Sequence, residues 1–357
     1  MPGPDGSEPD EMAVLSGWAT GGDPALLFVA QTGAGAARAL HAWIGGAGGQ
    51  RCTVRLSTPL EALRRPVSTA NGVFLVGTPV GVDSSPRVWR LPRASLAAGA
   101  LCDPHAPVAM SQPTPAEPLS RLEHCAGEVL FLGRALPGDA TSSAVGLWRL
   151  AADGSGAAFT PLPASAQPAL AADGQLLANP RCMLGGTAAA FATAAGPVAL
   201  VALTRNGTTA TLLVSDALGV SAYNGAQALA AVGADGLCFV ASLRAVGGAP
   251  PRGALLCWSP TEGLVEATAG PLVDAPAISW ALGTPSGHVY LPCSSGPDPS
   301  LLRACAYHAL TRTWAATPAG VTLSYSSFTS HGGRLYFGAA ESPGGRPVLF
   351  AAPLLLA

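Results

Sequence analysis

Gly72-Val-Phe74 and Gly236-Leu-Cys-Phe239 are two copies of a short apolar motif, usually led by glycine, that recurs along this chain. Further copies are Leu130-Phe131, Gly287-His-Val-Tyr290 and Gly333-Arg-Leu-Tyr336. A tryptophan often follows 15 to 19 residues after the aromatic residue, as in the pairs Phe28 and Trp43, Phe74 and Trp89, Phe131 and Trp148, and Phe239 and Trp258. Aromatic and β-branched residues favour strands, so the motif predicts one β-strand and the tryptophan segment predicts a second.

The spacing of the motif predicts repeats. Phe28, Phe74 and Phe131 lie 46 and 57 residues apart, which is the length of a propeller blade. Glycine and proline number 44 and 33, as is typical of short strands joined by many turns. We therefore predict an all-β chain that forms a single β-propeller of four-stranded antiparallel blades. Seven blades fit best, and six is the alternative.

We expect residues 1–12 to form a flexible acidic tail and residues 13–357 to form the propeller domain. The fourth repeat is the least regular, although Asn206-Gly207 predicts a tight hairpin within it. Phe191 fits either the innermost strand of this blade or the repeated aromatic position. The segments Pro104–Pro118 and Pro163–Pro180 are expected to be loops.

Two kinds of known propeller repeat resemble parts of the chain. The residues Gly287-His-Val-Tyr-Leu and Ala304-Cys-Ala-Tyr-His-Ala-Leu-Thr-Arg-Thr-Trp314 resemble a kelch repeat, and His331-Gly-Gly-Arg-Leu-Tyr-Phe337 is similar at its start. Most blades lack the double glycine that normally follows the second kelch strand. Val88-Trp-Arg-Leu91 and Gly146-Leu-Trp-Arg-Leu150 are similar to repeats built around a Glu-Leu-Trp core. The kelch-like resemblance covers nearly the whole chain and implies a propeller, but no single function.

The charge and the chain ends argue against several classes of protein. The net charge is −2 and no basic stretch occurs, so we expect neither nucleic acid nor a membrane surface as a partner. No apolar run at the N-terminus has the form of a secretory signal, which predicts an intracellular protein. The eight cysteines are then expected to be reduced and mostly buried.

The sequence carries none of the common short catalytic motifs for zinc, phosphate or nucleophilic serine. Cys102-Asp-Pro-His105 has the spacing of a metal-ligand pair, but a plain loop is the better interpretation. Histidines and tyrosines near the C-terminus suggest a copper site, although Tyr290 and Tyr336 occupy repeated core positions. We predict no cofactor and no metal, and we expect most repeated aromatic residues to form the core between blades.

The candidate binding residues are those expected on or near the innermost strands, where a ligand in the central channel would meet them. Glu123 and His124 could form an acid–base pair, and a satisfied network at a sheet edge is the alternative. The full set is Trp18, Arg121, Glu123, His124, Arg181, Asp235, Trp280 and His331.

Two functions follow from this pattern. The first is a non-catalytic scaffold that presents its loops to protein partners, either alone or as a subunit of a larger assembly. The second is a propeller enzyme, either a hydrolase or lyase or a metal-dependent oxidoreductase, with a pocket at the central channel. The sequence favours the protein-interaction module, and a small-molecule ligand is an open alternative.

Overall fold

The structure of the chain is a computed structural model. It describes residues 9–20, 23–30, 39–44, 50–81, 85–96, 101–112, 116–120, 122–125, 127–135, 144–162, 179–183, 186–191, 199–203, 209–213, 222–232, 236–244, 252–259, 261–267, 282–284, 286–294, 302–316, 322–331, 334–340 and 348–353. Almost all regular structure within these ranges is β-strand, with one short 3₁₀ turn, η2 (Arg93–Leu96). No helix in this part of the chain is long and apolar enough to cross a membrane.

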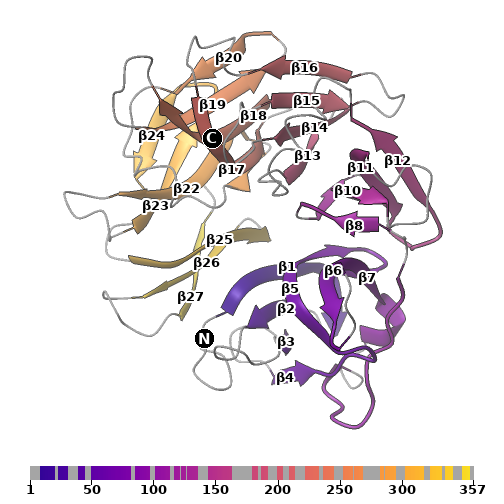
Figure 1. Cartoon of the computed structure of the whole chain (residues 1–357). Helices are drawn as coiled ribbons and strands as arrows, with labels where there is room; N and C mark the ends of the chain where they lie inside the picture. The colour runs from indigo at the N-terminus through magenta and orange to yellow at the C-terminus, as the bar shows by residue number, and fades with distance from the viewer. Residues whose placement is uncertain are drawn as a thin grey trace. The chain divides into compact units, whose positions relative to one another are not determined.

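The chain divides into two units, of which the first comprises Met1–Pro161 and Thr329–Gly332. This unit contains three antiparallel sheets, in which neighbouring strands of each path are hydrogen-bonded (Figure 1). Their strands are β1 (Pro9–Thr20), β2 (Asp23–Ala30), β3 (Ala39–Ile44) and β4 (Gln50–Val54); β5 (Leu60–Thr69), β6 (Gly72–Pro79) and β7 (Arg87–Pro92); and β8 (Ala116–Pro118), β9 (Glu123–Cys125), β10 (Glu128–Ala135), β11 (Val145–Ala151) and β12 (Ala157–Pro161).

The second unit comprises Leu162–Phe328 and Gly333–Ala357. It contains three four-stranded sheets and most of a three-stranded sheet, whose first strand ends at His331. Their strands are β13 (Asn179–Met183), β14 (Gly186–Phe191), β15 (Ala199–Leu203) and β16 (Thr209–Leu213); β17 (Ala222–Val232), β18 (Gly236–Arg244), β19 (Arg252–Ser259) and β20 (Gly263–Glu266); β21 (Leu282–Gly283), β22 (His288–Ser294), β23 (Leu302–His308) and β24 (Thr313–Ala316); and β25 (Thr322–His331), β26 (Arg334–Ala340) and β27 (Val348–Pro353).

Each sheet is built from strands that follow one another along the chain, which is how propeller blades are built. The described residues form seven such sheets, so the prediction of seven blades agrees with the structure. Four sheets have four strands, while two have three and one has five. The expectation of uniform four-stranded blades was therefore only partly correct.

Several local predictions can be compared with individual strands. Phe191 lies in β14, the second strand of its sheet, so it occupies the repeated aromatic position. The predicted hairpin pairs Leu203 with Thr209, although Asn206-Gly207 itself lies outside the described residues. Strand β1 begins at Pro9, within the expected acidic tail of residues 1–12. The strand β8 lies within the expected proline-rich loop, which was wrong for those residues.

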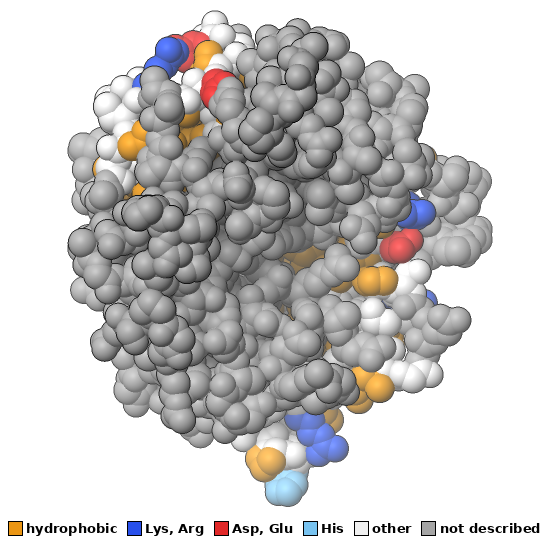
Figure 2. Space-filling model, turned by 60° about the vertical axis from the view of Figure 1, so that its left-hand side comes forward, with side chains coloured by type: hydrophobic (Ala, Val, Ile, Leu, Met, Phe, Trp, Pro, Cys, Tyr) orange, Lys and Arg blue, Asp and Glu red, His pale blue; other side chains and the backbone are white. Residues whose placement is uncertain are grey.

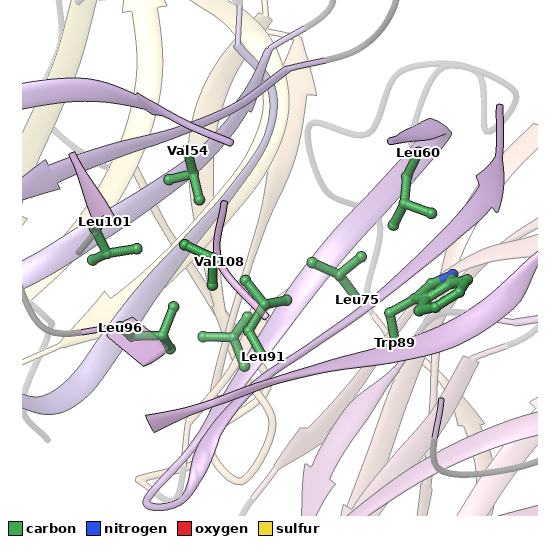
Figure 3. Close-up of a cluster of buried hydrophobic side chains, with 9 residues drawn as sticks. Val54, Leu60, Leu75, Trp89, Leu91, Leu96, Leu101 and Val108 are labelled. Atoms are coloured by element: carbon green, nitrogen blue, oxygen red, sulfur yellow. The ribbon is translucent and has the colours of Figure 1, made fainter. Parts of the chain in front are cut away.

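The second sheet of the first unit buries both of its faces. Along β6, Val73 and Leu75 point into a cluster with residues from β4 and β7 and from the segment after η2 (Figure 3). Phe74 and Val76 alternate with them and pack in another cluster with residues of the third sheet, including Phe131. Successive strand residues point to opposite faces, so the run of apolar residues in β6 indicates a strand with no solvent-facing side.

The same packing joins two sheets of the second unit. Val232, Cys238 and Leu255 of the sheet β17 to β20 cluster with Val289 and Leu291 of the sheet β21 to β24. The repeated aromatic residues lie in such cores: Phe74, Phe131 and Phe239 are fully buried. The prediction that these residues form the core between blades is confirmed at these positions.

The six cysteines whose side chains the structure describes are disulfide-bonded, in contrast to the predicted reduced thiols. Cys52 of β4 is bonded to Cys102, and Cys238 of β18 is bonded to Cys257 of β19. Cys125 and Cys305 are also disulfide-bonded. The prediction failed because cysteines that are scattered singly in the sequence come together through strand pairing and loop return, which spacing alone does not reveal.

Burial in the second unit generates a stability prediction. Leu291 is fully buried in β22, whereas Leu310, in the turn between β23 and β24, is 80% exposed. We expect Leu291→Ala to lower the free energy of unfolding by about 2 to 5 kcal/mol, because it leaves a cavity between two sheets. Leu310→Ala removes the same atoms from a solvated turn and should change the free energy of unfolding by less than about 0.5 kcal/mol. Denaturant unfolding of both variants is the measurement, and equal effects would contradict the described packing.

A second prediction concerns Gly133, where β10 passes close to β8. A Cβ atom on Gly133 would lie 2.6 Å from the Glu117 carbonyl oxygen and 3.2 Å from Cδ1 of Trp148. Gly133→Ala should therefore destabilise the protein by about 1 to 3 kcal/mol through overpacking. Gly156→Ala is the matched control, because no atom lies within 4 Å of its Cβ position. The control should leave the melting temperature unchanged or slightly raised, and a tolerated Gly133→Ala would refute this strand contact.

Candidate functional site

The first strands of neighbouring sheets contact one another within each unit. In the first unit β5 contacts β1 and β9, and in the second unit β17 contacts β13 and β21. Irregular register is concentrated in these strands: β1, β5 and β17 all carry register shifts against their second strands. In the third sheet the first strand is divided into β8 and β9, which both pair with β10. Bulges re-aim side chains and are frequent beside functional sites, so the first strands are the natural place for a binding site.

The predicted site residues fall partly on these strands. Trp18 lies in the irregular stretch of β1 between Val14 and Ala19. Arg181 lies on β13 opposite Ala188, and His331 is the last residue of β25. The side chains of these three candidates are outside the described part of the structure. Arg121, Asp235 and Trp280 lie outside the described residues altogether.

Glu123 and His124 are neighbours on β9, where they pair with Leu130 and Val129 of β10. Consecutive strand residues point to opposite faces, which separates the carboxylate from the imidazole. Glu123 is half-buried and His124 is exposed. Crowding of the ring lowers the pKa of His124, and the charge of Glu123 offsets part of this effect. The structure does not favour the acid–base pair, because the two groups do not share a face.

An ion pair on the third sheet was missed by sequence reasoning. Glu117 of β8 lies opposite Arg134 of β10, and Oε2 of Glu117 is 3.3 Å from Nε of Arg134. Both side chains are partly exposed, so the pair adds little stability. Glu117 was placed in a loop because the proline-rich composition around it hid a three-residue strand.

The most developed polar cluster lies where β21 turns into β22. Thr284 Oγ1 accepts a hydrogen bond from the His288 backbone N–H at 3.1 Å and lies 3.2 Å from the His288 carbonyl oxygen. Ser286 Oγ lies 2.9 Å from Thr284 Oγ1 and 3.2 Å from Nδ1 of His288. The turn ends at Gly287, whose φ of +91° favours glycine. This turn therefore holds a hydroxyl against a histidine nitrogen.

His308 of β23 lies directly opposite His288, and the two rings meet edge to face with centroids 4.5 Å apart. Burial lowers the pKa of His288, and the neighbouring His308 adds to this effect. Nδ1 of His308 accepts the Thr311 backbone N–H at 3.1 Å. That nitrogen is therefore unprotonated, and the proton of neutral His308 is on Nε2. His288 is buried, and its lowered pKa favours the neutral imidazole.

Two earlier ideas about metals can be tested against these contacts. The thiol of Cys102 is bonded to Cys52, so the Cys102 and His105 pair does not offer a thiolate. Nε2 of neutral His308 carries a proton and is not a free ligand nitrogen. No group of three or more His, Cys, Asp or Glu side chains within the described ranges could hold a metal ion.

Charged side chains are sparse among the described residues on the face drawn in Figure 2. Among the described side chains on the face drawn in Figure 2, charged groups occur singly or in small groups rather than as a continuous patch of one sign. This distribution agrees with the 11% of charged residues in the sequence.

Comparisons with solved structures identify the fold. The chain resembles a puromycin hydrolase with a TM-score of 0.59 at 15% identity, over 97% of this chain and 52% of that one. It resembles the β-propeller domain of the Trilobed protease from Pyrococcus furiosus with a TM-score of 0.58 at 8% identity, over 97% and 93%. An acylaminoacyl peptidase from Pyrococcus horikoshii gives 0.55 at 7% identity, over 94% and 51%. No family model and no curated protein matches the chain.

At these identities the likeness establishes the β-propeller fold. The chain spans about half the length of the puromycin hydrolase and of the acylaminoacyl peptidase. The neighbours are peptidases and a protease domain, which contradicts the prediction of a non-catalytic scaffold. The missing motifs were weak evidence for a scaffold, because propeller sites can draw their residues from several blades and then leave no contiguous motif.

The buried histidine generates a prediction for acid stability. The pKa of His288 is lowered from its usual 6.5 in the folded chain, so the unfolded chain binds a proton more readily. The free energy of unfolding should therefore fall as the pH decreases through about 6.5. We expect His288→Asn to weaken this pH dependence, measured as denaturant midpoints between pH 7.5 and 5.5. The exposed His105, replaced in His105→Asn, is the control, and equal slopes for all three proteins would refute the role of His288.

Proposed function

We propose that this chain is the propeller of a hydrolase that acts on an amide or ester bond, and that a peptide-like substrate binds where the first strands turn into the second strands. The supporting observation is the likeness, over more than nine-tenths of the chain, to a puromycin hydrolase, a protease propeller domain and an acylaminoacyl peptidase. Propellers offer such sites because loops from several blades converge there.

Within the described residues, Ser286 and His288 are best placed to take part in such a reaction. A serine hydroxyl becomes a nucleophile when a neighbouring base accepts its proton. The lowered pKa keeps His288 neutral at pH 7, which is the state that accepts a proton. Thr284 Oγ1 donates to the His288 carbonyl oxygen at 3.2 Å. If that proton turns to Ser286 instead, the Ser286 hydroxyl is free to donate to His288 Nδ1, across the observed 3.2 Å.

Other expectations stand as proposals of narrower scope. The kelch-like resemblance concerns the sequence repeats and implies no function. Binding of a protein partner stays a prediction. An intracellular location is less favoured than the sequence suggested, because stable disulfides form mainly in oxidising compartments. The metal-dependent oxidoreductase has less support than the hydrolase, because Cys102 is bonded to Cys52 and is not a ligand thiolate.

The test is hydrolysis of aminoacyl and short peptidyl anilides by the purified full chain, followed by release of the chromophore. We expect turnover at pH 7 to 8, and a loss of at least about a hundredfold in kcat/KM for Ser286→Ala, because the nucleophile is removed. His288→Gln should lower the rate similarly.

Ser155→Ala is the matched control, since Ser155 lies in the exposed turn between β11 and β12. Turnover that survives Ser286→Ala would support the hydrolase but exclude this residue pair. Neither turnover nor binding of the peptides, measured by calorimetry, would overturn the proposal.

A further inference from the structure

The segment Leu101–Gln112, which we call the strap, runs along the outer strands of the first two sheets of the first unit. At one end Val108 N–H donates to the Arg55 carbonyl at 2.7 Å, and Ser57 N–H donates to the Val108 carbonyl at 3.0 Å. Further along, Ser111 and Arg90 exchange two backbone hydrogen bonds of 2.9 and 2.8 Å. The strap thus extends the edge of β4 and serves as a rudimentary fourth strand beside β7.

The strap also covers an apolar cluster. Its residues Leu101 and Val108 are 1% and 3% exposed. They pack in one cluster with Val54 of β4, Leu91 of β7 and Leu96 of η2, as Figure 3 shows. Without the strap, this cluster and two backbone edges would face solvent. Uncovered edges of this kind pair readily with other chains.

Side-chain hydrogen bonds also tie the strap to its neighbours, among them one from Arg87 Nη1 to Gln112 Oε1 at 3.3 Å. The Arg55 guanidinium donates to the Pro104 carbonyl at 3.1 Å, and Met110 N–H donates to Ser57 Oγ at 3.2 Å. The covalent anchor is the disulfide between Cys102 and Cys52, which are 50 residues apart in sequence. Both of these cysteines are partly exposed, so a thiol in solution has access to the bond.

A second disulfide in the chain provides a contrast. Cys238 and Cys257 lie directly opposite each other on β18 and β19, whose register continues on both sides of the pair. They are 0% and 9% exposed. The strand ladder keeps these two residues together without the bond. The Cys52–Cys102 bond, in contrast, joins β4 to a segment that, within the described residues, pairs with its neighbours only through isolated bridges at Val108 and Ser111.

We propose that the Cys52–Cys102 disulfide holds the strap against its neighbouring strands, and that reduction of this bond releases the strap. A dithiol reductant attacks one sulfur and forms a mixed disulfide, and its second thiol then displaces the protein sulfur. Two electrons and two protons pass to the protein, which gains two thiols, while the reductant becomes a cyclic disulfide. The strap is then free to leave the edges of β4 and β7. Exchange with an oxidised dithiol, which takes up the two electrons and two protons, forms the bond again.

The test is hydrogen exchange of the full chain, read by mass spectrometry, before and after treatment with limiting dithiothreitol. We expect Cys52 and Cys102 to be alkylated before Cys238 and Cys257, because access governs thiol exchange. Peptides from the strap should then exchange at least about tenfold faster, since local opening no longer works against a covalent anchor. Peptides from β18 and β19 should exchange at the same rate as before.

Paired variants distinguish release of the strap from a general loss of stability. The double substitution Cys52→Ser and Cys102→Ser should reproduce the fast exchange of the strap without reductant. The double substitution Cys238→Ala and Cys257→Ala is the matched control and should leave the strap unchanged. If a variant fails to fold, alkylation and exchange of the wild-type chain decide the question. Reduction of both disulfides only on global unfolding, or reduction of Cys52–Cys102 with no change in strap exchange, would overturn the proposal.

Discussion

Burial of both faces of a sheet is the constraint on which this structure depends. The second sheet shows it most clearly, because Val73 and Leu75 enter one apolar cluster and Phe74 enters another on the opposite side. A strand with two buried faces cannot alternate apolar and polar residues, so its sequence becomes a continuous apolar run. The repeated motif of the chain is this run, and its spacing reflects the distance from one sheet to the next along the chain.

The first and outermost strands are under weaker constraint. First strands carry register shifts in β1, β5 and β17, and polar turns such as Thr284 to His288 can form where they end. The outer edges instead need cover. In the second sheet that cover comes from the strap rather than from a regular strand, and a disulfide fixes it in place.

The sequence predicted the parts that repeat and missed the parts that depend on long-range approach. Strands around Phe74, Phe131 and Phe239 were found because packing between sheets requires an aromatic residue at each position. The pairing of Cys52 with Cys102 has no local signal, since it depends on how the chain returns after η2. Ser286 was not singled out because no short catalytic motif marks it, and its contact with His288 depends on the turn at Gly287. The separation of Glu123 from His124 could have been foreseen, because strand alternation places neighbours on opposite faces.

The two-sided burial of β6 can be measured directly by comparing Phe74→Ala with Leu75→Ala, two adjacent residues whose side chains are 0% exposed. Their free energies of unfolding should both fall by about 2 to 5 kcal/mol, because each substitution leaves a cavity against a different neighbour. A large loss for one variant and a change below about 0.5 kcal/mol for the other would mean that β6 has a solvent-facing side. That result would contradict the packing of sheet against sheet from which the rest of this account follows.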